Sequence, residues 1–134
     1  MLDFQFLGTS AGIPTKTRNV TALAIGQTAS KPWLLVDCGE ATQQQILQTP
    51  WSANTLSAIC ITHVHGDHCY GLLGLLASAG MTGRREPLLL IAPAEILQWF
   101  TISAQLTDLH LGYDVQLIDS TSIETAALEI GEGI

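Results

Sequence analysis

Residues 59–68 decide how the rest of the chain is interpreted, and their sequence is Ile59-Cys60-Ile61-Thr62-His63-Val64-His65-Gly66-Asp67-His68. Three of the four histidines in the 134-residue chain fall here, in the pattern His-x-His-x-Asp-His. A short β-type run precedes the pattern, and the apolar run at 71–77 follows it. A strand, a tight polar turn and a helix in this order place a site at the carboxyl end of a sheet strand.

The four candidate metal ligands of this pattern are His63, His65, Asp67 and His68. Imidazole and carboxylate suit zinc, and catalytic zinc sites keep one position open for water. One ion cannot readily take four ligands so close in sequence, whereas two ions can, with His63 and His65 facing one and the other pair facing the second. Two-metal sites suit displacement at phosphorus. The same donors suit manganese and iron, so the identity of the metal stays open.

Composition narrows the class of protein. The chain is 47% hydrophobic but only 13% charged, against about 25% in typical domains. Its length predicts one domain at most, with a real core. We expect no secretory signal, because no basic region precedes an apolar run at the start. No membrane span is expected either, since the uncharged run at 69–83 is shorter than about 20 residues. Cys38, Cys60 and Cys69 form no C-x-x-C pair, and we expect buried or free thiols in the reducing cytoplasm.

Hydrophobic periodicity predicts a mixed α/β (α+β) domain. We expect strands at 2–7, 20–25, 33–36, 57–62, 88–92, 115–118 and 123–130, and helices at 40–48, 71–79 and 94–106. Grouped strands followed by alternating helices and strands indicate a mixed sheet with helices on at least one face. Gly131–Gly133 resembles a turn and Ile134 the start of a further strand. We therefore expect residues 1–134 to be the amino-terminal portion of a longer, truncated domain.

A second motif, Gly8-Thr9-Ser10-Ala11-Gly12, matches the G-x-S-x-G elbow of serine hydrolases. That elbow needs a strand before it and a helix after it. Ile13-Pro14 and the polar run behind it do not open a helix, and His110 is the only histidine left to act as a base. We expect a tight turn that requires small residues.

The run His63–His68 resembles the signature of the metallo-β-lactamase superfamily. Within that superfamily the chain resembles the ribonuclease Z family, the tRNA 3′-processing endonucleases, of the bacterial type. The metal motif alone indicates only the superfamily, and the Pro-x-Lys-x-Arg-Asn run indicates ribonuclease Z. The similarity covers the first two-thirds of the chain and rests on the runs 6–12, 14–19, 37–40, 63–68 and 71–76, which read FLGTSAG, PTKTRN, DCGE, HVHGDH and GLLGLL.

The resemblance implies an αββα sandwich with a dinuclear zinc site, of which only the amino-terminal part is present. It implies that His63 and His65 bind the first zinc, that Asp67 and His68 bind the second, and that Asp67 orients or deprotonates the attacking water. It also implies a homodimer that cleaves precursor tRNA after the discriminator base and leaves a 3′-hydroxyl. Three more ligands and a general-acid histidine would lie beyond Ile134, so we expect the fragment alone to be inactive.

Charge argues against a nucleic-acid substrate, because a net charge of −7 is a poor match for phosphates. Lys16 and Arg18 form one local basic spot, and with Asn19 they are the candidate substrate-binding residues. Arg84 and Arg85 form another, for which we favour a solvated surface without a ligand. Three hypotheses therefore stand: the endonuclease, another hydrolase of the superfamily acting on a small ester, thioester or cyclic phosphodiester, and a non-catalytic module.

Overall fold

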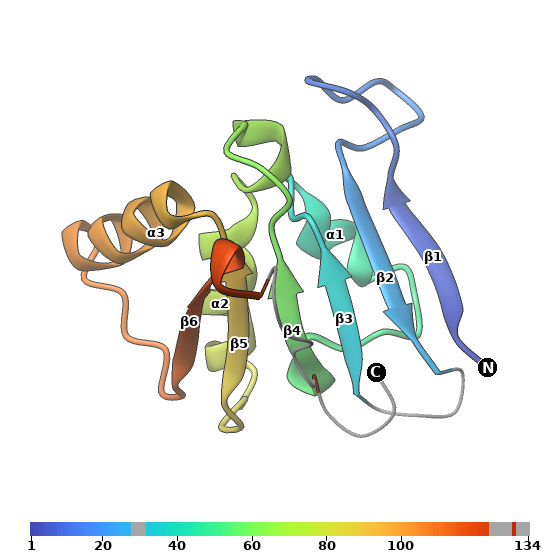
Figure 1. Ribbon diagram of the computed structural model, residues 1–134. Helices are drawn as coiled ribbons and strands as arrows, with labels where there is room; N and C mark the ends of the chain where they lie inside the picture. Colours follow the sequence, from blue (N-terminus) through green and yellow to red (C-terminus); the bar gives the residue numbers. More distant parts are fainter. Residues whose placement is uncertain (28–31, 124–129, 131–134) are drawn as a thin grey trace.

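The computed structural model describes residues 1–27, 32–123 and 130. Six strands form one mixed sheet in sequence order (Figure 1). The strands are β1 (Asp3–Gly8), β2 (Ala22–Gly26), β3 (Trp33–Val36), β4 (Leu56–Cys60), β5 (Leu88–Ala92) and β6 (Val115–Asp119). The helices are α1 (Thr42–Ile46), α2 (Leu72–Met81) and α3 (Ala94–Leu106), with 3-10 turns at Ala53–Thr55, Gly66–His68 and Ser120–Ile123.

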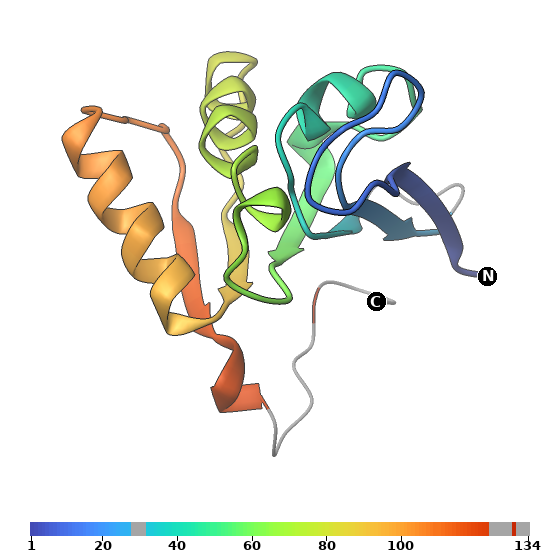
Figure 2. The same cartoon turned by 90° about the horizontal axis from the view of Figure 1, so that it is seen from above.

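The sheet changes direction at β3. Strands β1, β2 and β3 pair antiparallel, whereas β3, β4, β5 and β6 pair parallel. Parallel neighbours need a crossover, and α1, α2 and α3 lie in the three crossovers. Seen from above, all three helices lie on the same face of the sheet (Figure 2). The carboxyl ends of β3, β4 and β5 therefore meet at one edge.

The core lies between the sheet and its helices. Leu35, Ile59 and Leu90 are register partners on adjacent strands, so their side chains share one face. All three are fully buried, in one cluster with Leu72 and Leu76 of α2. Burying a side chain of this size stabilises the fold by about 1.5–3 kcal/mol. The apolar run of β5 is explained by this position, because a central parallel strand is covered on at least one face along its length.

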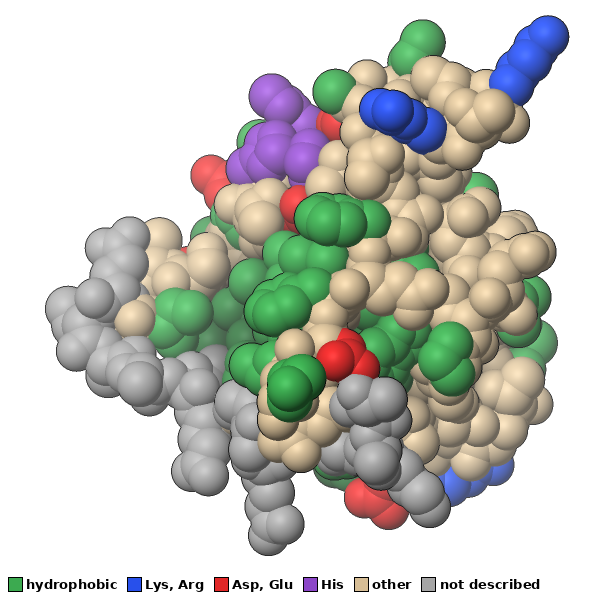
Figure 3. All heavy atoms as spheres, turned by 90° about the vertical axis from the view of Figure 1, so that its right-hand side faces the viewer, with side chains coloured by type: hydrophobic (Ala, Val, Ile, Leu, Met, Phe, Trp, Pro, Cys, Tyr) green, Lys and Arg blue, Asp and Glu red, His purple; other side chains and the backbone are tan. Residues whose placement is uncertain are grey.

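Among the residues that the structure describes, no α-helix lies on the other face of the sheet (Figure 2). Phe4 and Phe6 of β1 are 62% and 71% exposed there. Their register partners Ile25 and Leu23 are half-buried on the same face. Hydrophobic side chains gather in a band on the molecular surface viewed from the β1 side (Figure 3). An apolar sheet face of this kind is normally packed against another layer.

Most of the expected elements are confirmed. The strands expected at 33–36 and 88–92 and the helix at 94–106 have the same bounds in the structure. The helix expected at 40–48 is shorter, because Ala41 adopts a left-handed φ of 63° and cannot belong to it. Ile123, expected to start a strand, ends a 3-10 turn instead. The rest of that strand, at 124–129, and the turn and strand start at 131–134 lie outside the described residues. No helix in the described ranges is long and apolar enough to cross a bilayer.

Candidate metal centre

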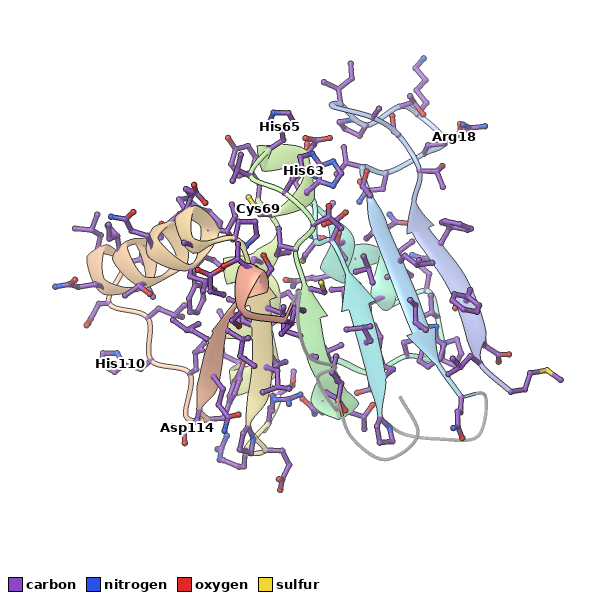
Figure 4. The ribbon with its side chains drawn as sticks, in the orientation of Figure 1. Arg18, His63, His65, Cys69, His110 and Asp114 are labelled. Atoms are coloured by element: carbon purple, nitrogen blue, oxygen red, sulfur yellow. The ribbon has the colours of Figure 1, made fainter. Side chains whose placement is uncertain are left out.

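His63 and His65 lie beyond the carboxyl end of β4 (Figure 4), and histidine side chains gather at one place on the surface in Figure 3. His63 and His65 follow the strand, and His68 closes the 3-10 turn Gly66–His68. The ring centroids of His63 and His65 are 4.9 Å apart, and those of His63 and His68 are 3.9 Å apart. Asp67 joins them, with its Oδ2 atom 3.3 Å from Nε2 of His68. The structure thus brings all four predicted ligands to one edge of the sheet.

Asp37 follows β3, and its carboxylate contacts the residues of this cluster. Its carboxylate is buried and accepts hydrogen bonds from the Thr62 backbone N–H at 2.8 Å and the Thr62 hydroxyl at 3.0 Å. Its Oδ2 atom lies 2.8 Å from Nδ1 of His68. An ionised carboxylate only accepts, so Nδ1 of His68 donates and Nε2 carries the free lone pair. Fixing one imidazole nitrogen in this way sets the tautomer that a metal ligand needs.

His63 is oriented in a similar way by its neighbour in the chain. The Thr62 hydroxyl lies 2.9 Å from Nδ1 of His63 while it donates to Asp37. A hydroxyl has one proton, so the Nδ1 of His63 must donate to the Thr62 oxygen. Nε2 of His63 is then left as the free nitrogen. Two of the three histidines therefore present the same ring atom for coordination.

The turn that carries Asp37 is strained and tightly packed. Asp37 and Ala41 have φ values of 59° and 63°, in the left-handed region that non-glycine residues rarely adopt. A Cβ on Gly39 would lie 2.3 Å from the Asp67 carbonyl oxygen. The Glu40 Oε2 atom is buried and has no hydrogen-bond partner within the described ranges. Strain of this kind persists only where the surroundings over-determine the backbone, and it gathers at functional sites.

Asp67 is also held by the loop that follows β1. The Gly12 N–H donates to its Oδ2 atom at 2.9 Å. This hydrogen bond is the main reason why the pKa of Asp67 lies below its usual value, and the nearby His68 and His65 add to the effect. The contact joins residues far apart in sequence. It is the direct link between the motif and the loop at 9–19.

The same loop carries the candidate substrate-binding residues. Lys16 and Arg18 are exposed, and Figure 4 shows Arg18 at the same edge of the molecule as His63 and His65. Asn19 is half-buried, and its amide nitrogen donates to the carbonyl of Glu40 at 2.8 Å. The Thr15 hydroxyl accepts from the backbone N–H of Arg18 at 3.0 Å, which closes a local turn. Asn19 is thus tied into the fold, whereas the two cations project into solvent.

In the other basic spot Arg85 is exposed but Arg84 is buried. Arg84 is only 3% exposed and donates to the backbone carbonyls of Ala53, Glu86 and Pro87. Its guanidinium carbon lies 5.2 Å from the centroid of the Tyr113 ring. Burial lowers the pKa of Arg84 and raises that of Tyr113 to about 12. The solvated surface expected for this pair is therefore wrong for Arg84, whose guanidinium bonds backbone carbonyls inside the fold, whereas Arg85 is exposed as expected.

The structure also explains why Gly8–Gly12 is not the nucleophile elbow of a serine hydrolase. Residues 9–19 form a loop with no helix after β1, and the Ser10 hydroxyl donates to the carbonyl of Ile13. His110 lies on the opposite side of the molecule from the labelled histidines (Figure 4). Its Nδ1 atom is 2.9 Å from the Asp108 carbonyl oxygen, in the turn after α3. Ser10 and His110 therefore cannot form a nucleophile–base pair.

All three cysteines are free, as expected. Cys38 and Cys69 are buried beside the metal motif, and Cys60 is half-buried in β4. Burial raises the pKa of Cys38 to about 12 and raises the pKa values of the other two thiols. A thiol binds metal as a thiolate, so these shifts favour the histidines and Asp67 as ligands.

The donor set suits divalent metal, although no three His, Cys, Asp or Glu side chains in the described part of the chain enclose an ion as they stand. The Nδ1 atoms of His63 and His68 are already bonded, which leaves Nε2 of each ring as the nitrogen that could coordinate an ion. Asp67 adds a carboxylate oxygen at the same place. A second carboxylate behind a ligating histidine, as Asp37 provides here, is the usual outer support of such ligands.

Sequence reasoning missed the residues that support the cluster. Asp37 was part of a recognised run but carried no role, and Thr62 and the Gly12 amide carried none. A signal was present for Asp37, because an acid directly after a buried strand lies at the same sheet edge as the motif. The Gly12 contact had no sequence signal, since any residue except proline supplies a backbone N–H.

The chain is similar to one family model and to several curated proteins. The chain matches the family described as "Anti-Pycsar protein Apyc1" over residues 2–107. It is 55% identical over 117 residues to Ribonuclease Z of Pseudomonas putida strain W619, covering 87% of this chain and 36% of that protein. Ribonuclease Z of Marinobacter nauticus is 50% identical over 119 residues, covering 89% and 37%. The chain thus spans little more than a third of these curated relatives.

Solved structures agree. The short form of human tRNase Z superposes with a TM-score of 0.78 at 31% identity, over 87% of this chain and 43% of that chain. The metallo-beta-lactamase fold protein YhfI from Bacillus subtilis gives 0.67 at 22% identity, over 88% and 46%, which shows the fold alone.

The mixed sheet, its one-sided helices and the histidine cluster at the strand ends define a partial metallo-β-lactamase-like α/β fold. The chain belongs to the family described as Anti-Pycsar protein Apyc1, and it is homologous to the N-terminal portion of bacterial ribonuclease Z. The resemblance inferred from the runs at 6–19, 37–40 and 63–76 is thereby confirmed.

The close contact at Gly39 leads to a stability prediction. Gly39→Ala should lower the free energy of unfolding of the chain by about 3 kcal/mol, because the new Cβ would overlap the Asp67 carbonyl and the Val20 side chain. Urea unfolding measures the change. Gly74→Ala is the matched control, since a Cβ there meets only the Gln43 side chain at 3.4 Å. In mid-helix that variant should be up to about 1 kcal/mol more stable. Equal unfolding midpoints for the two variants would contradict the packing at Gly39.

Proposed function

We propose that residues 1–134 form the amino-terminal part of a metal-dependent endoribonuclease that removes the 3′ trailer from precursor tRNA and leaves a 3′-hydroxyl. The observation that carries the proposal is the cluster of His63, His65, Asp67 and His68, supported by Asp37, in a chain 55% identical to a ribonuclease Z. The likeness to human tRNase Z supports tRNA as the substrate class. The cluster would hold two zinc ions, with His63 and His65 on one and Asp67 and His68 on the other.

Bound metal would supply a water of lowered pKa and positive charge near the phosphate oxygens. Asp67 is the proposed catalytic residue, which accepts the proton of the attacking water. The Gly12 N–H fixes its Oδ2 atom and so directs the carboxylate. The Asp37 carboxylate keeps His68 in one tautomer, and Thr62 does the same for His63. These contacts position groups before the substrate arrives, which is where much of an enzyme's electrostatic catalysis originates.

The loop at 9–19 would hold the acceptor end of the tRNA. Lys16 and Arg18 are exposed cations of this loop, and phosphates are natural ligands of such cations. Arg18 lies at the same edge of the molecule as His63 and His65 (Figure 4). Asn19 fixes the base of the loop through Glu40 and leaves its own Oδ1 atom for the substrate. We further propose a cytoplasmic homodimer. The free thiols support the compartment, and the ribonuclease Z resemblance supports the dimer.

A second candidate is a hydrolase of a small ester or cyclic phosphodiester. The observation in its favour is the family match, whose description, Anti-Pycsar protein Apyc1, names no tRNA. The same metal cluster would serve either substrate. The basic loop distinguishes the two candidate functions. An endoribonuclease would use Lys16 and Arg18 to hold the acceptor stem, whereas a hydrolase of a small substrate would not need them.

A paired assay on the whole protein tests the proposal. Asp67→Ala should abolish hydrolysis of both precursor tRNA and bis-p-nitrophenyl phosphate, because it removes a ligand and the proton acceptor. Lys16→Ala with Arg18→Ala should reduce only tRNA cleavage, by about tenfold or more, since two charge-assisted phosphate contacts are lost. Arg85→Ala is the control for loss of a surface cation. It is exposed and donates to the Arg84 carbonyl, so it should leave both activities unchanged.

Three outcomes are decisive. A loop variant that cuts tRNA as well as the wild type would remove the assigned role of the loop. A wild-type protein that hydrolyses the small phosphodiester but no precursor tRNA would leave the second candidate. If neither substrate is hydrolysed, the chain is a non-catalytic module.

A further inference from the structure

Two aromatic side chains, one exposed and one half-buried, form a pair next to the metal motif and have no role in the chemistry described so far. Tyr70 follows the motif by two residues and is 66% exposed. Trp99 comes from α3 and is partly buried against the core. Their ring centroids are 6.4 Å apart and the ring planes are inclined by 52°. The two inclined rings therefore form an open angle, called here the aromatic corner. Trp99 is its buried side and Tyr70 is its exposed side.

Tyr70 is held in place by the motif itself. A Cβ built on Gly66 would lie 2.0 Å from the Cζ atom of Tyr70, so the ring lies directly on the Gly66 backbone. The backbone N–H of Tyr70 also donates to the Gly66 carbonyl at 2.8 Å. Gly66 stands between His65 and Asp67 in the sequence. The aromatic corner is thus adjacent to the proposed ligands.

Exposure at this place needs a reason. A large aromatic side chain left mostly in water gives up the free energy that its burial would provide. Exposed apolar side chains next to a functional site often mark a surface that binds part of a ligand. Every nucleobase has an aromatic face, and bases of single strands stack on exposed tyrosine and tryptophan rings. A base next to the scissile phosphate is the part of an RNA substrate that would reach this corner.

We propose that Tyr70 and Trp99 form a stacking site for the nucleobase adjacent to the scissile phosphate. This inference rests on the proposed ribonuclease function and adds a base-binding contact to it. The site is sequence-tolerant, because stacking uses the face of the base and not its hydrogen-bonding edge. It also compensates for the acidic charge of the chain, since stacking does not depend on cations.

Binding of precursor tRNA to the whole protein, measured after chelation of metal so that no cleavage occurs, tests the stacking site. Tyr70→Leu should raise the Kd about 5- to 150-fold, the loss of one stacked base. Tyr70→Phe keeps the ring and should bind like the wild type. Met81→Ala is the control for loss of an exposed apolar side chain, since Met81 is 81% exposed at the end of α2. It should change nothing.

A precursor tRNA with one abasic nucleotide identifies which nucleobase stacks on Tyr70. One abasic substrate on each side of the cleavage position is compared with the intact precursor. In the wild type, one of the two should bind more weakly by the same factor as Tyr70→Leu binds intact RNA. The abasic site and Tyr70→Leu should then be non-additive, as expected for two halves of one contact. Full additivity, or unchanged binding by Tyr70→Leu, would overturn the stacking site.

The two proposals fail in different ways. If the protein hydrolyses precursor tRNA but Tyr70→Leu binds it normally, only the stacking site is wrong. If the wild type binds RNA through Tyr70 yet cuts none, the ribonuclease function is wrong and the corner is a base-binding site alone. If the wild type neither binds nor cuts RNA, both are overturned. Unfolding midpoints of Tyr70→Leu and the wild type should agree, because the side chain is mostly exposed.

Discussion

Replacing His63 and His65 together by alanine should remove at least one of the two proposed metal ions from the whole protein and lower its phosphodiesterase activity about a thousandfold or more. Both side chains lie at the carboxyl end of β4, and the two alanines remove the proposed ligands of one ion. Stabilisation of charge by a metal is worth several kcal/mol, and each 1.36 kcal/mol is a factor of ten in rate. Metal content by elemental analysis and hydrolysis of bis-p-nitrophenyl phosphate measure the two effects.

The matched control is His110→Ala. The His110 side chain is 84% exposed and lies on the opposite side of the molecule, so metal content and activity should not change. Elemental analysis of the wild type also identifies the metal, since zinc, manganese and iron all accept imidazole and carboxylate. Unchanged metal content in the double histidine variant would refute the ligand assignment.

Asp37→Asn should weaken metal binding by the whole protein about 10- to 100-fold, the usual effect of removing a carboxylate behind a ligating histidine. The substitution keeps the size of the side chain but removes its charge. Asparagine can still accept from the Thr62 N–H, but it no longer supplies the negative charge that holds the Nδ1 proton of His68. Titration against a competing chelator gives the affinity.

Asp37→Ala separates this electrostatic effect from the structural one. Alanine also removes the hydrogen bonds that the N–H and the hydroxyl of Thr62 donate to Asp37, and one hydrogen bond contributes about 0.5–1.5 kcal/mol to stability. Alanine should therefore lower the unfolding midpoint more than asparagine does. Asp114→Asn, an exposed carboxylate far from the histidines, is the control (Figure 4). If Asp37→Asn and Asp114→Asn bind metal equally well, Asp37 has no part in supporting the ligands.

The placement of the candidate ligands was predictable because it depends on local geometry. A strand followed at once by a polar turn can only present that turn at its own carboxyl end, so β4 carries the motif to the sheet edge. The same reasoning applies to β5 and α3, whose bounds follow from a continuous apolar run and the proline before the helix. Whether these residues bind metal stays a prediction.

Hydrophobic periodicity predicted the wrong bounds for two elements, one helix and one strand. The helix expected at 40–48 begins only at Thr42, because Ala41 has a left-handed φ of 63° that an α-helix cannot include. The strand expected to reach Thr62 ends at Cys60, and the Thr62 N–H bonds to Asp37 instead of continuing the sheet. Propensity describes what a segment prefers by itself, and tertiary contacts override it at such places.

The sequence by itself determined the resemblance to ribonuclease Z, the order of most elements and the four residues that follow β4, because each depends on residues close together in the chain. Only the tertiary structure decided which distant groups support those residues. The Asp37 carboxylate reaches His68 and the Gly12 amide reaches Asp67 across 31 and 55 positions. The tertiary structure also buried Arg84 and brought Tyr70 against Trp99. Such contacts depend on how strands and helices pack, and no local pattern of residues encodes the pairing.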